Sequence, residues 1–250
     1  MDSFPDLLRH WRQQRRFSQL DLSLEAGVSA RHISFLETGR ARPSRDMILH
    51  LGDVLSVPLD MRNRMLGAAG FAARYRRSAL DADALAPIRQ ALDWTLDRHA
   101  PYPGIAIDGH WVIQRMNDPA RHLFGALGLD AGASMIDLIL RPDVQAIIEN
   151  WPEVAHHSAQ RLRTESAALG GDDVLDQAAR DLAPHAQSPI ADTPTVPTVI
   201  RLGDMRLSLF ATIAQFGTPT DQTVDDLKIE LFFPADDQSA ATLRALADQR

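Results

Sequence analysis

Residues 18–37 read SQLDLSLEAGVSARHISFLE, and this stretch decides the fold of the N-terminal part. Ser18 and Ser29 each precede a short helical pattern, where a serine hydroxyl can accept from the free N–H groups of a helix start. Gly27 stands between the two patterns, where a sharp turn favours a left-handed backbone. A small core between the helices is expected from Leu22, Ala26, Val28, Ile33 and Leu36. The spacing therefore predicts a helix-turn-helix.

Three more short helices are predicted around this motif. The first follows Ser3, and its apolar residues recur at the helical spacing i, i+3, i+4, i+7 as Phe4, Leu7, Leu8 and Trp11. The second begins after Pro43-Ser44, and the third begins at Pro58. These five helices predict a compact all-α domain over residues 1–71.

The five helices, the turn glycines Gly27 and Gly39, and the Pro43-Ser44 helix start together resemble the Cro/repressor (XRE) family over residues 4–70. The resemblance implies a domain that binds double-stranded DNA, with its second motif helix in the major groove. A helical module that binds other proteins is the alternative. The candidate DNA-binding residues are Gln19, Ser29, Ala30, Arg31, Ser34, Phe35, Arg40, Arg42 and Ser44.

These candidates have different expected roles. Gln19 resembles the phosphate-contacting glutamine of the family, and Ser29 at the start of the second helix also suits a phosphate. Arg31 can donate two hydrogen bonds to guanine, and Phe35 or Ala30 can meet a thymine methyl group. The alternative is that Arg31 contacts only phosphate. The remaining three after the second helix, Arg40, Arg42 and Ser44, are expected to hold the DNA backbone.

Composition narrows the class of protein. The chain has 250 residues and no cysteine, which allows one or two domains and excludes disulfides, thiolate zinc sites and iron–sulfur clusters. The absence of cysteine fits a reducing compartment. The first residues are charged and no apolar run is long enough to span a bilayer, so neither a signal peptide nor a membrane partner is expected. We therefore predict a cytoplasmic protein.

Charge is divided unevenly along the chain. Residues 1–77 hold 13 arginines against 8 acidic residues, a net charge of +5, whereas residues 78–250 hold 13 basic and 25 acidic residues, a net charge of −12. This asymmetry indicates a polyanion-binding domain joined to a partner domain of another kind. The alternative is an arginine-rich helical surface that only contacts solvent.

A linker over residues 72–84 is expected before a second domain at 85–235, with a C-terminal tail at 236–250 that could be helical. Apolar runs at 105–107 and 111–113 flank Asp108-Gly109, which predicts a hairpin with a tight turn. Three more strands are predicted at 199–202, 205–215 and 226–233, after a helical middle and a proline-rich loop at 184–198. The pattern predicts an α+β domain with an antiparallel sheet.

The second domain looks PAS-like, and the whole chain resembles the MmyB-like transcription regulators. The resemblance lies in VIQRMNDP at 112–119, LFG at 123–125 and NWPEVA at 150–155. It implies a ligand-binding domain for a small apolar, fatty-acyl-like molecule. The candidate cavity residues are Ile105, Ile107, Trp111, Ile113, Leu138, Ile147, Trp151, Leu207, Leu209, Ile229 and Leu231. The alternative is that the same residues form a dry core.

No catalytic or metal site is expected, because the chain has no glycine-rich phosphate loop, no His-Glu-x-x-His and no Gly-x-Ser-x-Gly motif. No cofactor is expected beyond a bound fatty-acid-like molecule. We predict a transcription regulator that acts as a homodimer on a palindromic operator and senses a small apolar ligand. The alternatives are a repressor whose second domain is only a scaffold for dimerisation or protein interaction and, third, an enzyme with a DNA-binding head.

Leu20 and Leu24 fit none of these roles. Both should point outward from a helix whose inward face is already made by Leu22 and Ala26. They are expected to dock on the second domain or on a dimer mate, or else to pack loosely against the first helix.

Overall fold

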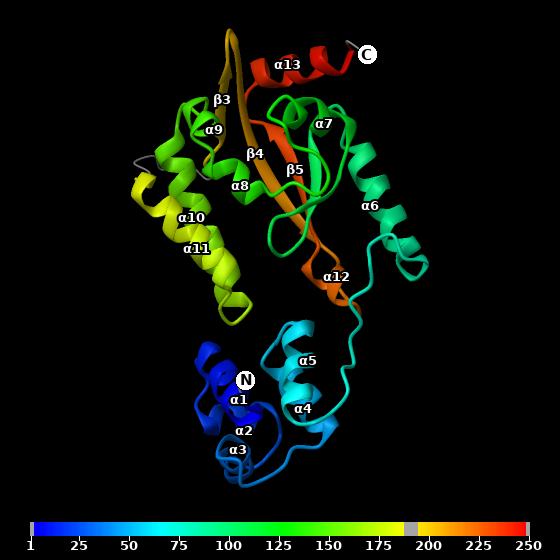
Figure 1. The fold of residues 1–250 in the computed structure, drawn as a ribbon, viewed down its shortest axis with the longest axis vertical. Coiled ribbons are helices and arrows are strands. Elements are labelled where there is room, and N and C mark those ends of the chain that lie inside the picture. Colours follow the sequence, from blue (N-terminus) through cyan, green and yellow to red (C-terminus); the bar gives the residue numbers. More distant parts are fainter. Residues whose placement is uncertain (1–2, 188–194, 249–250) are drawn as a thin grey trace. The chain divides into compact units, whose positions relative to one another are not determined.

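The computed structural model describes residues 3–187 and 195–248, so the centre of the predicted proline-rich loop, 188–194, lies outside the described residues. The chain divides into two compact units (Figure 1). The first unit comprises the chain up to Arg77 with the short segments Ser166–Asp172 and Thr218–Asp225, and the second unit comprises the rest. The domain and linker limits drawn from the sequence remain predictions. Within the described residues, every helix is too short or too polar to cross a bilayer.

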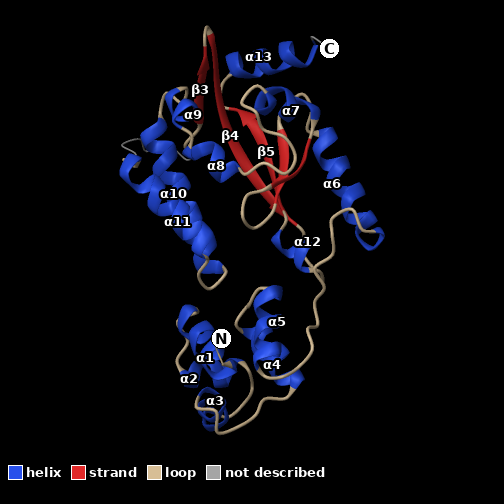
Figure 2. Ribbon diagram, viewed as in Figure 1, coloured by secondary structure: helices blue, strands red, loops and turns tan. Residues whose placement is uncertain are grey.

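The N-terminal part of the first unit is helical (Figure 2). Its helices are α1 (Phe4–Gln14), α2 (Gln19–Glu25), α3 (Ala30–Glu37), α4 (Arg45–Val54) and α5 (Leu59–Ala68). Serine hydroxyls accept from a backbone N–H in the first turn of α1 to α4, as the sequence predicts, and Pro58 precedes α5. Gly27 has a φ of +63°, and a Cβ there would meet nothing within 4 Å, so the turn needs glycine for its backbone angle and not for space.

One buried apolar cluster holds these helices together. Trp11, Leu22, Ile33, Leu36 and Leu51, from four different helices, are all 0% exposed. A cluster of this density has well-defined rotamers, so it fixes the orientation of α3 relative to α2.

The second unit contains a five-stranded antiparallel sheet in the order β2-β1-β5-β4-β3. The strands are β1 (Gly104–Ile107), β2 (Ile113–Met116), β3 (Thr198–Leu202), β4 (Met205–Gln215) and β5 (Lys228–Pro234). The α-helices outside residues 4–68 are α6 (Ala86–Arg98), α7 (Asp118–Gly125), α8 (Met135–Leu140), α9 (Pro142–Ala146), α10 (Trp151–Ala168), α11 (Asp173–Leu182), α12 (Gln222–Asp226) and α13 (Asp237–Asp248). The chain is thus a helix-turn-helix region followed by an α+β domain with an antiparallel sheet, as predicted.

The first hairpin differs in detail from the prediction. Its strands are Gly104–Ile107 and Ile113–Met116, so the second strand begins at Ile113 and not at Trp111, and Val112 forms an isolated bridge with Ser134. The Asp108 carboxylate accepts from the backbone N–H of His110 and Val112, at 2.9 and 3.0 Å, and this stabilises a longer loop than Asp-Gly alone would make. The left-handed backbone conformation falls on Trp111, with a φ of +62°.

Strand register separates the two faces of the sheet. Ala211 pairs with Phe232 and Ile213 pairs with Glu230, so these side chains share one face. Leu231 lies on the other face, where a Cβ built on its partner Gly104 would lie 3.1 Å from a methyl of Leu96 on α6. The face on which a β5 residue lies therefore alternates, and Glu230 and Phe232 are on the face opposite to α6.

Asn117 joins several elements of the second unit. The buried side chain accepts from the N–H of Gly104 and Ala120 and donates to the carbonyls of Leu96 and Tyr102, at 2.9 to 3.0 Å. Both N–H groups of its amide nitrogen and both lone pairs of its amide oxygen are thereby used. Asn117 thus fixes the end of α6, the start of β1 and the start of α7 relative to one another.

Candidate functional site

Two arginines and one aromatic ring form a cluster on and just after α3. Arg31 is exposed, and its guanidinium carbon lies 5.1 Å from the centre of the Phe35 ring. The guanidinium carbon of Arg40 lies 6.0 Å from the same ring. Contact with an aromatic face restricts both arginines and leaves their N–H groups free to donate. This cluster presents fixed positive charge beside the outward face of α3.

The other DNA-binding candidates lie around this cluster. Ser29 caps α3 by accepting from the N–H of His32 at 3.2 Å, and Ser44 caps α4 by accepting from Met47 at 3.1 Å. A hydroxyl that accepts still has its O–H to donate, so both caps can also bind an anion. Ala30 and Ser34 are half-buried on α3, and Arg42 is exposed after it.

A buried carboxylate links α1, α2 and α3 behind this surface. Glu37 is 2% exposed, and Arg12 donates to both of its carboxylate oxygens, at 2.6 and 3.0 Å. Gln19 donates through its amide nitrogen to Glu37 at 2.8 Å, and Arg9 donates to the Glu37 carbonyl at 2.6 Å. Because an amide nitrogen has two N–H groups, Gln19 keeps one for a phosphate oxygen.

The charge of Glu37 is stabilised by this cluster. Burial by itself raises the pKa of the carboxyl, but the hydrogen bonds from Arg12 and Gln19 and the charges of Arg12 and Arg9 lower it by more. The net effect is a pKa below the ordinary value, so Glu37 is ionised at neutral pH. The sequence carries one sign of this role: Glu37 follows Ile33 and Leu36 on the inward face of α3, where a charge must be paired.

The second unit holds a cavity of about 270 Å³ on the Glu230 face of the sheet. This volume is near the lower end of the roughly 300–1,000 Å³ of ligand pockets. Four of the eleven predicted residues line it: Trp111, Leu138, Ile147 and Leu209. Most of the other lining side chains are also apolar: Phe124, Leu127, Met135, Ile139, Val144, Ile148, Val154, Val196, Ile200, Phe210, Ala211 and Phe232.

The other seven predicted residues lie outside the lining: Ile105, Ile107, Ile113, Trp151, Leu207, Ile229 and Leu231. Ile229 and Leu231 are on the opposite face of β5, because the lining residues of that strand are Glu230 and Phe232. Ile105 and Ile107 are on the cavity face but are fully covered, with exposed fractions of 0% and 1%. Alternation along a strand identifies its two faces but does not say which side chains border empty space.

The sequence analysis did not identify the wall contributed by α10. Val154, His157, Ser158 and Arg161 line the cavity at the spacing i, i+3, i+4, i+7. This spacing puts the four side chains on one face of the helix. The same periodicity in the sequence could have shown it, but three of the four residues are polar, so an apolar pattern does not select them.

Charged groups are paired at the polar side of the cavity. Arg161 donates to Glu165 at 2.8 Å and also pairs with Glu230, and its guanidinium carbon lies 4.3 Å from the centre of the Trp111 ring. Lys228 pairs with Glu165 at 2.6 Å, and the Trp111 indole N–H donates to the same carboxylate at 2.7 Å. The two positive and two negative charges balance.

The pKa of Glu165 follows from these contacts. Burial raises the pKa, but the hydrogen bond from Lys228 and the charge of Arg161 lower it by more, and the result lies below the ordinary value. The carboxylate is therefore ionised at neutral pH, and the network keeps its pairing.

His157 is the exception to this pairing. Its Nε2 atom is buried and has no hydrogen-bond partner, whereas Arg161, one turn further along α10, pairs with two carboxylates through its Nε and Nη2 atoms. A buried polar atom without a partner is costly to the folded state.

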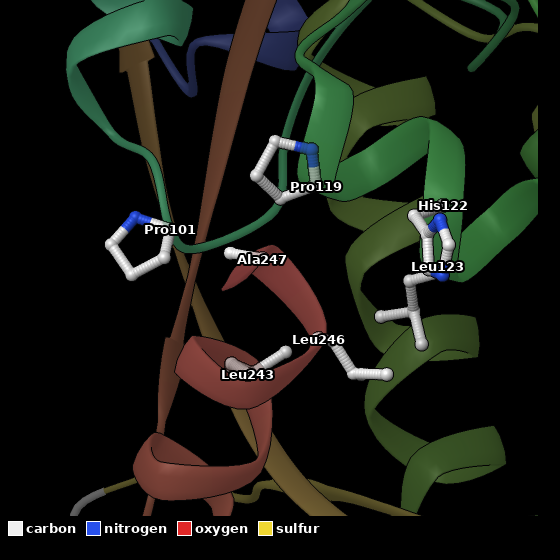
Figure 3. Close-up of a pocket in the computed structure, with 7 residues that line it drawn as sticks. All are labelled: Pro101, Pro119, His122, Leu123, Leu243, Leu246 and Ala247. Carbon is white, nitrogen blue, oxygen red and sulfur yellow. The ribbon is translucent and has the colours of Figure 1, made fainter. Parts of the chain in front are cut away.

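A second hollow lies where α13 packs on α7. Figure 3 shows its lining, which includes Leu123 of α7 and Leu243 and Leu246 of α13. Its volume is about 10 Å³, which is room for about one water molecule. The cavity on the Glu230 face is the candidate ligand site of the second unit, because its wall is mostly apolar.

A helix-turn-helix with arginines beside its second helix, followed by an α+β domain with an apolar cavity, defines a transcription regulator with a ligand-binding domain. Residues 4–65 match the family model of a helix-turn-helix domain, and residues 88–246 match that of the MmyB-like transcription regulator ligand binding domain. The chain belongs to the MmyB-like transcription regulators. Both matches confirm the resemblance seen in the sequence, and neither family is catalytic. No curated protein gives a significant match to the chain.

Proposed function

We propose that this regulator binds a specific operator through α3 and that a small apolar ligand in the cavity of the second unit changes its affinity for that operator. The observation that carries the ligand part is the cavity itself, about 270 Å³ in volume with a mostly apolar wall. Contact between water and an apolar wall costs free energy, so a molecule with an apolar chain is favoured over water in this cavity.

The DNA part assigns a base contact to one side chain. Arg31 is the exposed cation on the outward face of α3 and reads guanine, with Phe35 beside it. Gln19, Ser29 and Ser44 have N–H or O–H groups to donate to phosphates, and Arg40 and Arg42 add charge. Ala30 and Ser34 face the groove. A homodimer on a palindromic operator would place two such helices about one turn of DNA apart.

Salt dependence tests the DNA part. The logarithm of the binding constant for duplex DNA should fall with the logarithm of salt concentration, with a slope of about 0.9 per neutralised phosphate. A flat dependence would exclude binding through the arginines and would favour a module that binds protein. Sedimentation of the complex tests the dimer, since two chains on each operator are expected and one chain would contradict it.

Native mass spectrometry of the purified full chain, followed by solvent extraction, tests the ligand part. A bound molecule with an apolar chain is expected. Ala211→Phe, which fills the cavity from β4, should abolish its retention, whereas Ala214→Phe on the same strand outside the lining should not. A chain that arrives empty and binds no apolar compound would favour a second domain that acts only as a scaffold.

A further inference from the structure

Strand β4 extends beyond the strand that covers its outer edge (Figure 1). β3 pairs with β4 over residues 205–209 only, whereas β4 continues to Gln215. Pro197 directly precedes β3 and has no N–H to donate, and its carbonyl accepts from the Asn150 side chain at 2.8 Å, so the chain leaves the ladder there. Beyond Leu209, β4 is therefore itself an edge of the sheet among the described residues.

The backbone groups of three residues point out of this edge. Phe232 of β5 donates its N–H to the carbonyl of Pro103, which directly precedes β1, so Phe232 and its partner Ala211 exchange no hydrogen bonds. Ala211 thus directs its N–H and C=O away from β5, and the alternation along a strand gives Ile213 and Gln215 the same direction. Within residues 3–187 and 195–248, these backbone groups have no hydrogen-bond partner.

This stretch also lacks the features that protect a sheet edge. Residues 208–217 read SLFATIAQFG, without charge or proline, and residues 211–215 are all exposed, with Ile213 at 47%. The outer edge of β3, in contrast, is covered, since the Val199 carbonyl accepts from the N–H of Glu149 at 2.8 Å. Native edge strands are guarded by charges, proline or a covering segment, because a bare edge is a template for another strand.

A second copy of this chain fits this edge. An uncharged strand offers nothing to a charged peptide, and it brings no like charges together when it meets itself. An antiparallel pair with Ile213 opposite itself places Ala211 opposite Gln215 of the partner subunit, and each of these pairs can exchange two hydrogen bonds. Leu209 is already paired with β3, so the free stretch has room for this register. The arrangement is two-fold symmetric and therefore closes at two copies.

We propose that the chain dimerises by pairing the free edge of β4 with the same edge of a second copy, antiparallel about a two-fold axis at Ile213. Main-chain hydrogen bonds then join two five-stranded sheets into one. This proposal rests on the homodimer of the proposed function and assigns its surface.

Opposite charges at one position test the register. Sedimentation velocity of the full chain without DNA should show a dimer. Ile213→Lys and Ile213→Glu each place like charges opposite one another and should weaken dimerisation roughly tenfold, whereas an equimolar mixture of the two should recover a heterodimer. Val174→Lys, at another exposed β-branched residue, is the control and should leave the dimer unchanged. Circular dichroism verifies that each variant keeps its fold.

A second pair of variants isolates the backbone. Ile213→Pro removes an N–H that faces away from β5, so the fold keeps its ladder while the dimer loses two hydrogen bonds and weakens about tenfold. Ile213→Val keeps the N–H and should stay within about twofold of the natural chain. A dimer that none of the charged or proline variants weakens, or a mixture that stays monomeric, would overturn the surface alone.

The oligomeric state on DNA separates this proposal from the proposed function. A chain that is monomeric without DNA would overturn the β4 interface. If two such chains still occupy each operator, the proposed homodimer on DNA stands, whereas one chain on each operator would overturn both.

Discussion

Both units pair a half-buried arginine with a buried carboxylate, but in different surroundings. In the first unit, Arg12 and Glu37 lie against a cluster of apolar side chains, several of them 0% exposed. In the second unit, Arg161 and Glu230 lie in the wall of a cavity of about 270 Å³. An arginine–carboxylate pair therefore holds three helices together in the first unit, and a similar pair borders a cavity in the second unit.

This difference indicates which unit keeps one arrangement and which unit can gain contacts with a ligand. A buried ion pair with good geometry adds little net stability but is costly to break, so it makes one arrangement of α1, α2 and α3 much better than its alternatives. A side chain in a cavity wall has neighbours on one side only, so it lacks van der Waals contacts on the side that faces the cavity. The first unit is thus built to hold Arg31 and Gln19 in place, and the second is built to gain contacts when a molecule enters.

Among the variants proposed here, Glu37→Ala should have the largest effect, and it tests the ion pair in the packed first unit. The substitution leaves the Arg12 charge buried without its partner and frees Gln19, so the first unit should lose about 3–5 kcal/mol of unfolding free energy. Amide hydrogen exchange, which reports each unit separately, measures the loss. Glu25→Ala, an exposed control on α2, should change it by less than about 0.5 kcal/mol.

Acid provides an independent check on the same carboxylate. Because the folded-state pKa of Glu37 is lowered, its stabilising contribution is present above the unfolded pKa of about 4.3 and is lost as the pH falls through the folded value. The Glu37→Ala chain should lack this loss. Parallel acid sensitivity in both chains would contradict the role of the cluster.

Matched leucine truncations compare the two surroundings directly. Leu36→Ala in the packed core should cost the first unit about 2–5 kcal/mol, because the surrounding side chains cannot close the space. Leu138→Ala only enlarges an existing cavity, so the second unit should lose less, about 1–2 kcal/mol. Hydrogen exchange measures both, and equal losses would mean that the cavity wall is as tightly supported as the core.

The helix-turn-helix was predictable from sequence because its signals are local. Serine caps, the Gly27 turn and helical spacing act within a few residues, and all of them appear in the structure. The Arg12–Glu37 pair was not predictable in the same way, because it joins residues 25 positions apart. Glu37 on an apolar face indicates only that some partner must exist.

The cavity was predictable only in part because it depends on what packing leaves unfilled. Alternation in β4 and β5 correctly gave strands, but Ile229 and Leu231 face away from the cavity while Glu230 and Phe232 face it. The α10 stripe combines His157, Ser158 and Arg161 with one valine, so no apolar pattern marks it. Which face borders empty space is a tertiary property.

Arg31→Ala tests whether the fixed surface reads sequence. The substitution should cost about 1–3 kcal/mol of operator affinity and relax preference at one base pair in each half-site. Arg40→Ala is the matched control: it contacts the same ring, but should weaken all sequences alike and reduce the salt slope. Binding to a library of operator variants measures both. A uniform loss with Arg31→Ala would reassign it to a phosphate.

The smallest expected effect comes from replacing Leu20 and Leu24, and it concerns the coupling between ligand binding and operator affinity. They are 59% and 73% exposed, so α1 does not cover them, and docking on a dimer mate or on the acidic domain remains the prediction. Replacing both with serine should reduce the effect of the molecule extracted from the purified chain on operator affinity by about 1 kcal/mol, within the usual range of coupling free energies. An unchanged effect would leave these leucines without a role in regulation, and folding should be little affected since both are exposed.

The central claim is that occupancy of the cavity changes DNA binding. Operator affinity measured with and without a saturating concentration of the molecule extracted from the purified chain tests it most directly. A ligand regulates only if it binds the two binding states differently, so the account predicts a change of about 5–150-fold in the full chain. The change should disappear in Ala211→Phe, whose cavity is filled, and persist in Ala214→Phe. Binding of that molecule to the full chain, shown by calorimetry, with no change in operator affinity would contradict the account.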